Sequence, residues 1–180
     1  MSRPEVRLVV LYEDETHGKF VRHLTRKLGL RPERLEPCGG CVSVLDRFVL
    51  ELKAMRHRMK YQHNLGLMVV IDADDASIVP RLRDLEERLL SSDTGGARRE
   101  TERIAYIVPA REIENWYVHL CVPDARPVDE SKDYKPEPVW KGLEKNLGAT
   151  ARQAVDAWVH ADKTGEPASL TAARLELKRL

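Results

Sequence analysis

The chain has 180 residues, a length typical of one domain, and 42% of them are hydrophobic, which is enough for a buried core. Lysine and arginine number 30 and aspartate and glutamate 29, so the net charge of +1 neither indicates nor excludes a nucleic-acid partner. No apolar run reaches the roughly 20 residues of a membrane span, no signal peptide is recognisable, and 3 cysteines argue against a disulfide framework, so we expect a soluble, cytoplasmic protein with no membrane partner.

Apolar periodicity divides the first two thirds of the chain into alternating strands and helices. In chain order we predict strand 6–12, helix 16–29, strand 33–37, helix 43–59, strand 65–71, helix 77–90, strand 103–109 and helix 111–120. Thr16 and Ser43 stand where helix N-caps belong, and Pro80 falls in a first helical turn, where proline is tolerated. The strand at 65–71 is apolar throughout, which predicts a central strand covered on both faces.

The last third of the chain has a different character. Residues 121–138 are polar and rich in proline, and short helices are predicted around 139–147, 151–161 and 170–180. Strands that alternate with helices predict an α/β layered domain in residues 1–120, with a largely parallel four-stranded sheet and helices on both faces. Residues 121–180 are then a Pro-rich connection and a C-terminal helical extension packed on that domain.

Acidic residues follow three of the predicted strands. The clusters are Glu13, Asp14 and Glu15 after the first strand, Asp72, Asp74 and Asp75 after the third, and Glu112 and Glu114 after the fourth. Functional groups collect at the carboxyl ends of strands in open parallel sheets, and neighbouring strands lie about 5 Å apart. Carboxylates this close repel one another unless a cation neutralises them, and hard oxygen ligands suit Mg²⁺ or Mn²⁺.

The order of these motifs resembles that of the TOPRIM domain, which topoisomerases, DnaG-type primases and OLD-family nucleases share. The segment "LVVLYEDETHGKFVRHL" is similar to the first TOPRIM motif, with Glu13 in the place of the family glutamate, although Asp14 stands where the family often has glycine. "MVVIDADD" is similar to the second motif, with Asp72 and Asp74 as its aspartates. "IVPAREIENWYV" resembles a motif of small stand-alone TOPRIM-like proteins. The likeness covers roughly residues 6–120.

The resemblance implies a Rossmann-like TOPRIM fold and Mg²⁺- or Mn²⁺-dependent hydrolysis of phosphodiesters. Glu13, Asp72, Asp74 and Glu114 are the catalytic candidates it implies. The candidate metal ligands are Glu13, Asp72, Asp74, Asp75, Glu112 and Glu114, of which the last two could serve a second ion. On a helix Glu112 and Glu114 point to different faces, which favours Glu114 as a ligand and Glu112 as a cap or support.

The same resemblance implies partners and a setting. Nucleic acid, with DNA preferred, would be the substrate, and phage defence or DNA repair the context. The chain has no P-loop of its own, so a separate ATPase subunit is a candidate partner, and a homo-oligomer is compatible with the sequence.

Three alternatives stay open. A TOPRIM-like module without catalysis would bind nucleic acid or an ATPase partner. The run "VVLYEDE" also resembles the start of a receiver domain, where an acidic pair binds Mg²⁺ beside a phosphoacceptor aspartate, although Lys135 does not follow an apolar strand as the receiver lysine would. Finally, Cys38 and Cys41 form a C-x-x-C before a helix, a pattern typical of thioredoxin-like redox sites.

Overall fold

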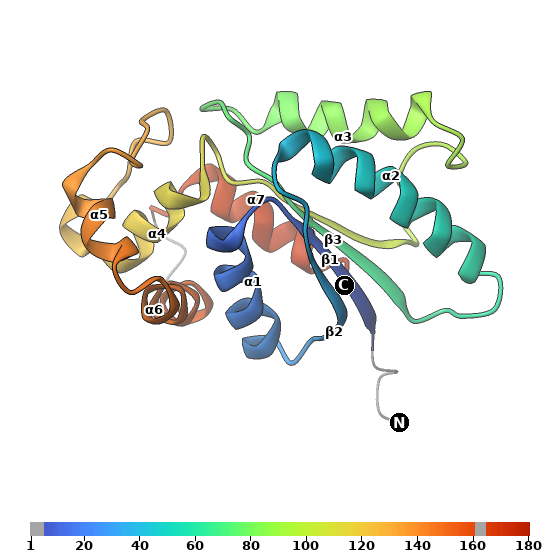
Figure 1. Cartoon of the computed structure of the whole chain (residues 1–180), viewed down its shortest axis with the longest axis horizontal. Coiled ribbons are helices and arrows are strands. Elements are labelled where there is room, and N and C mark those ends of the chain that lie inside the picture. Colours follow the sequence, from blue (N-terminus) through green and yellow to red (C-terminus); the bar gives the residue numbers. More distant parts are fainter. Residues whose placement is uncertain (1–5, 161–164) are drawn as a thin grey trace.

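The computed structural model describes residues 6–160 and 165–180 and has a parallel sheet between helical layers (Figure 1). The strands, in chain order, are β1 (Arg7–Tyr12), β2 (Arg31–Pro37), β3 (Leu65–Val70) and β4 (Arg103–Ile107). The helices are α1 (Glu15–Lys27), α2 (Cys41–Arg58), α3 (Val79–Ser91), α4 (Ile113–Cys121), the short 3₁₀ helix η1 (Pro123–Ala125), α5 (Pro138–Glu144), α6 (Leu147–His160) and α7 (Ala168–Leu177). The prediction of an α/β layered fold with a four-stranded sheet is therefore confirmed.

The order of the strands creates a switch point in the middle of the sheet. All described strands are parallel and run in the order β2-β1-β3-β4. The chain moves from β1 outward to β2 and then crosses back to β3 on the other side of β1. The connections leave the carboxyl ends of β1 and β3 in opposite directions, and this is where open α/β sheets place their ligands.

Helices cover both faces of the sheet. The helices α2 and α3 pack on one face, with Phe48 and Leu85 among the buried side chains there, while α1 lies on the other face (Figure 1). Every residue of β3 is buried, which agrees with its uninterrupted apolar sequence and its central position. In the part of the chain that the structure describes, no helix is long and apolar enough to cross a membrane.

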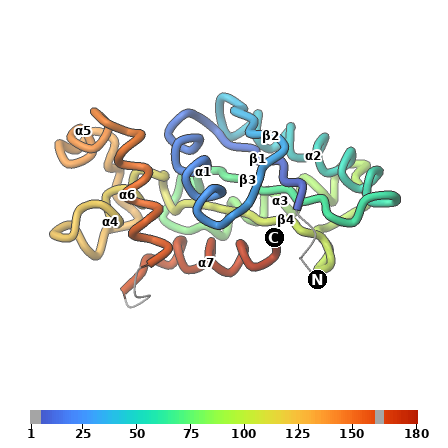
Figure 2. The backbone as a smooth tube through the Cα atoms, turned by 90° about the horizontal axis from the view of Figure 1, so that it is seen from below, coloured from blue at the N-terminus to red at the C-terminus, as the bar shows by residue number. Residues whose placement is uncertain are grey.

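The C-terminal third shares a core with the sheet. Helices α4, α5 and α6 gather at one end of the molecule, and α6 packs against α1 and α4 (Figure 2). Phe20 of α1, Trp116 of α4 and Trp158 of α6 form an aromatic cluster with ring centroids 5.7–5.8 Å apart. Trp116 is fully buried and donates to Ser169 Oγ of α7 at 2.7 Å, so this tryptophan is a core residue.

Helix α7 protects the outer edge of β4. The carboxylate of Glu176 accepts the N–H of Tyr106 at 2.9 Å, and Arg179 donates to the carbonyl of Ile104 at 3.0 Å. An edge strand with unpaired backbone groups can recruit other chains, and here Glu176 of α7 and Arg179, which follows that helix, satisfy two of those groups.

Two predicted helix caps were wrong. Helix α1 begins at Glu15, and its N-cap is Asp14 in place of the predicted Thr16. Helix α2 begins at Cys41 after Gly40, so Ser43 lies inside the helix and does not cap it. Pro80 does occupy the first turn of α3. The last residue of the helix predicted at 151–161 lies outside the described residues.

Candidate metal centre

The first part of the candidate site is built where β1 passes into α1. The backbone of Asp14 is extended, and its Oδ1 accepts the N–H groups of Thr16 at 2.9 Å and His17 at 3.2 Å. An aspartate at this position satisfies backbone donors that the first helical turn would otherwise leave unpaired. The same Oδ1 lies 2.8 Å from Nδ1 of His17. Asp14 therefore starts the helix and also orients the imidazole.

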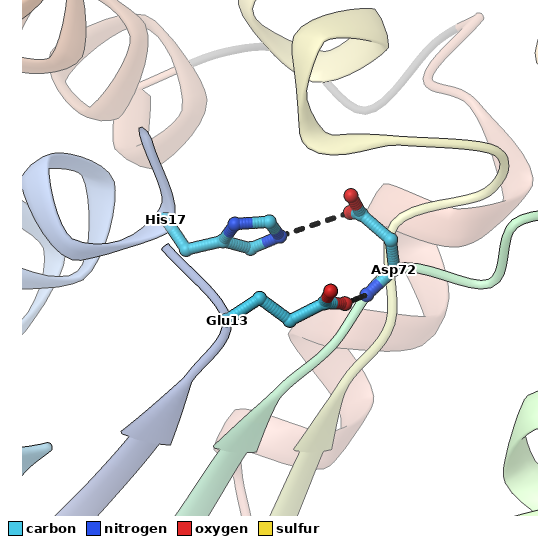
Figure 3. Close-up of side chains that lie close together, drawn as sticks. All are labelled: Glu13, His17 and Asp72. Atoms are coloured by element: carbon cyan, nitrogen blue, oxygen red, sulfur yellow. Dashed lines mark hydrogen bonds and ion pairs between the residues drawn. The ribbon is translucent and has the colours of Figure 1, made fainter. Parts of the chain in front are cut away.

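Glu13 connects the ends of the two central strands. Its Oε1 accepts the backbone N–H of Asp72 at 2.6 Å, directly beyond the carboxyl end of β3 (Figure 3). Burial, together with the nearby charge of Asp72, raises the pKa of the Glu13 carboxyl above its ordinary value. A carboxylate in this position gains from any cation placed beside it.

His17 and Asp72 face each other across the switch point. Nε2 of His17 lies 3.0 Å from Oδ1 of Asp72, and the two residues are 1% and 4% exposed (Figure 3). Burial alone would lower the pKa of His17. The charge of Asp72 and the hydrogen bonds to Asp14 and Asp72 outweigh burial and raise this pKa to about 10. In the metal-free protein His17 is thus an imidazolium that donates to both aspartates.

Glu13, His17 and Asp72 are arranged so that they could share one ion. One ligand atom from each of them lies within 4.8 Å of the others. The carboxylate of Asp14 is hydrogen-bonded to Nδ1 of His17, and Nε2 of the same ring is directed at Asp72. A histidine that ligates a metal usually has such a hydrogen-bonding partner on its other ring nitrogen. One imidazole and two carboxylates fit a divalent ion, and the imidazole favours Mn²⁺, Fe²⁺ or Zn²⁺ over Mg²⁺.

Asp74 and Asp75, two of the predicted ligands, point elsewhere. The carboxylate of Asp74 pairs with the guanidinium of Arg81 at 2.6 Å, and the carboxylate of Asp75 accepts the N–H of Ser77 at 3.3 Å. The charge of Asp74 nevertheless contributes to the raised pKa of Glu13, which indicates that Asp74 lies near the centre. The structure brings together two of the six predicted ligands, Glu13 and Asp72.

Arg81 of α3 holds the loop after β3 in place. Its Nε donates to the backbone carbonyl of Asp72 at 2.8 Å while its Nη2 pairs with Asp74. Asp74 adopts a left-handed conformation with φ 58°, and so does Arg111 on the neighbouring loop after β4. The two loops are joined by hydrogen bonds from Asp74 N–H to Arg111 O and from Arg111 N–H to Asp75 O. Left-handed non-glycine residues are uncommon and concentrate at functional sites.

Glu112 and Glu114 lie at the start of α4 and are paired with a lysine. Oε2 of Glu112 is 3.0 Å and Oε2 of Glu114 is 3.8 Å from Nζ of Lys135. Oε1 of Glu112 accepts the N–H groups of Tyr134 and Lys135, so both of its oxygens have partners. Burial raises the pKa of Glu114 to about 7, although the charge of Lys135 acts in the opposite direction.

Sequence reasoning missed His17 as a candidate ligand. Its four-residue distance from Glu13, just inside a helix that begins at a strand end, was the available signal, because one helical turn brings position 17 back over that end. The roles of Arg81 and Lys135 had no comparable signal. Arg81 lies inside an ordinary amphipathic helix, and Lys135 lies 63 positions after Asp72 in a Pro-rich segment.

The C-x-x-C segment contacts the backbone of the site. Cys38 donates its N–H to the carbonyl of Tyr12 at 2.8 Å, and Gly39 donates to the carbonyl of Glu13 at 2.7 Å. Cys38 and Cys41 are free thiols, and burial raises the pKa of Cys38, which is opposite to the shift that activates a redox cysteine. The structure therefore gives this segment a role in holding the β1–α1 turn.

Comparisons of the chain with protein-family models, with curated proteins and with solved structures find no match.

Proposed function

We propose that the protein is a metal-dependent phosphodiester hydrolase that acts on nucleic acid. The observation that carries the proposal is the group of Glu13, His17 and Asp72, whose ligand atoms lie within 4.8 Å of one another. The group sits beyond β1 and β3, where open parallel sheets bind ligands. The motif resemblance to TOPRIM domains supports the same chemistry. DNA as the preferred substrate and a separate ATPase subunit belong to the proposal through that resemblance.

The chemistry divides between the ion and the protein. A divalent ion held there would supply positive charge that polarises a phosphoryl oxygen and activates water. Glu13, His17 and Asp72 would hold the ion, and Asp14 would keep the imidazole in the ligating orientation. Arg81 would fix the backbone of Asp72, so that the carboxylates need little rearrangement. Glu114, with a pKa of about 7, is a candidate to accept a proton near neutral pH.

The test is a cleavage assay with the purified full chain. Supercoiled plasmid, a single-stranded oligonucleotide and an RNA of the same sequence are incubated with Mn²⁺, with Mg²⁺ or with EDTA. We expect Mn²⁺-dependent cleavage of at least one substrate, and at least a hundredfold loss in Glu13→Gln and Asp72→Asn. Asp75→Asn is the matched control, because Asp75 lies in the same loop but outside the ligand group.

A non-catalytic module is the alternative from a different class, and the same samples distinguish it. Gel-shift binding of each substrate is measured beside cleavage. Nucleic-acid binding without any Mn²⁺-dependent cleavage, in protein shown to bind Mn²⁺, would replace the hydrolase with a binding module.

A further inference from the structure

The segment 129–137, named the strap here, is fastened across the start of α4. Asn115 donates its side-chain amide to the carbonyls of Glu130 at 3.4 Å and Lys132 at 3.1 Å. Oε1 of Glu112 accepts the N–H groups of Tyr134 at 2.9 Å and Lys135 at 3.1 Å. These contacts from α4 and its N-cap Glu112 to the strap backbone place Lys135 beside Glu112 and Glu114.

Lys135 brings its positive charge to two buried carboxylates. The side chains of Glu112 and Glu114 are 8% and 4% exposed, whereas that of Lys135 is 50% exposed. Burial lowers the pKa of Lys135, but the charges of Glu114 and Glu112 outweigh burial and raise it. The ammonium therefore stays charged at any pH at which the protein would work.

One oxygen of the Glu114 carboxylate lacks a hydrogen bond in the part of the chain that the structure describes. Among the described residues, its buried Oε2 has no hydrogen-bond partner, and the ammonium of Lys135 lies 3.8 Å away. Glu114 and Lys135 both interact electrostatically with Asp72, so this second acidic group adjoins the ligand group of the candidate metal centre. Buried carboxylates are stabilised by a cation beside them, and Lys135 supplies that cation to Glu112 and Glu114.

We propose that Lys135 takes the place of a second divalent ion, so that the centre binds one ion, at Glu13, His17 and Asp72. This inference rests on the proposed function, because it specifies the cofactor stoichiometry of the same site. The half-exposed ammonium then supplies the second positive charge beside a bound phosphate. Glu112 and Glu114 act as the binding site of that lysine and are not metal ligands in the native chain.

The test counts bound Mn²⁺ at pH 8, above the pKa of about 7 of Glu114. Titrations follow the electron paramagnetic resonance signal of free Mn²⁺ in wild type, Lys135→Met, Lys135→Arg and Lys132→Met. Lys132 is the matched control, because it lies on the same strap and pairs with Glu137 at 3.1 Å, away from Glu112 and Glu114. We expect one ion in wild type, Lys135→Arg and Lys132→Met.

In Lys135→Met we expect a second ion, or a second site at least tenfold tighter than in wild type, and Glu114→Gln in that background should remove it. Circular dichroism confirms that each variant is folded. Two equally tight ions in wild type would overturn the inference, and so would a Lys135→Met protein in which neither the stoichiometry nor the affinity of the second site differs from wild type. If wild type binds no ion and Lys135→Met binds one, the candidate metal centre fails and the role of Lys135 stands. No ion in either protein overturns both.

Discussion

Oε1 of Glu13 accepts the backbone N–H of Asp72 at 2.6 Å, so a side chain from the end of β1 joins the end of its neighbour β3. The bond fixes the spacing of two acidic residues whose sequence separation is 59 positions. His17 completes the group from the first turn of α1. The consequences of this arrangement can be measured in the absence and in the presence of metal.

Asp72→Asn should lower the stability of the metal-free protein by about 1–3 kcal/mol, because the buried imidazolium of His17 loses a charged partner. Excess Mn²⁺ should raise the melting temperature of wild type by mass action and that of the variant much less. Differential scanning calorimetry with EDTA and with Mn²⁺ measures both effects. Equal Mn²⁺-induced shifts in the two proteins would remove Asp72 from the metal centre.

His17 makes the stability of the metal-free protein depend on pH. The pKa of His17 in the folded protein is about 10, above the ordinary value of 6.5. The ion pairs of His17 therefore contribute fully to the free energy of unfolding below pH 6.5, and this contribution is lost as pH rises through about 10. Urea unfolding in EDTA should show wild type losing stability relative to His17→Gln across this window. The exposed His57 provides a control substitution on α2, which should leave the slope unchanged.

The same protonation should oppose metal binding. A ligating histidine must be neutral, so the apparent affinity of wild type for Mn²⁺ should rise steadily between pH 6.5 and 9, with protons released on binding. Calorimetric titration in two buffers of different ionisation enthalpy measures that release. A pH-independent affinity would show that His17 stays outside the coordination sphere.

Glu114→Gln should stabilise the metal-free protein at pH 8. Burial raises the pKa of Glu114 in the folded protein from 4.5 to about 7. Below pH 4.5 the carboxyl is neutral and does not reduce the free energy of unfolding of wild type, which falls as pH rises through about 7 and the buried group ionises. The expected gain is about 1–3 kcal/mol at pH 8 and disappears toward pH 4.5. Glu87→Gln, at an exposed position of α3, should change little at either pH.

Arg81→Met should cost about 1–3 kcal/mol of stability and weaken Mn²⁺ binding at the same time, because Arg81 holds both the carbonyl of Asp72 and the carboxylate of Asp74. Arg83→Met, at an exposed position of the same helix, is the control. Loss of stability with unchanged Mn²⁺ affinity would limit Arg81 to a structural role.

Gly18 tests the packing that positions His17. A Cβ on Gly18 would lie 2.7 Å from Cε2 of Tyr12, so Gly18→Ala should push α1 away from β1 and cost about 1–3 kcal/mol. Gly148→Ala in α6 meets no atom within 4 Å and should stabilise the helix by about 0.5–1 kcal/mol. The paired unfolding curves separate close packing from helix propensity.

The apolar periods of the sequence were sufficient for the alternation of strands and helices and for the burial of β3, because both depend on local patterns of residues. The same patterns placed acidic residues after β1, β3 and β4, and Glu13 and Asp72 could be named before their contact was known. Helix caps depend on single backbone conformations, which is why Asp14 was missed in favour of Thr16.

Tertiary structure decided which acidic residues share a centre and which have other partners. Asp72 faces His17 because β1 and β3 are neighbours, whereas Asp74 turns to Arg81 of α3, and neither pairing has a local signal in the sequence. Lys135 reaches Glu114 because the strap folds back over α4, 21 positions along the chain. Carboxylates brought this close must each find a cation, and only the assembled fold determines whether that cation is an imidazolium, a guanidinium, an ammonium or a metal ion.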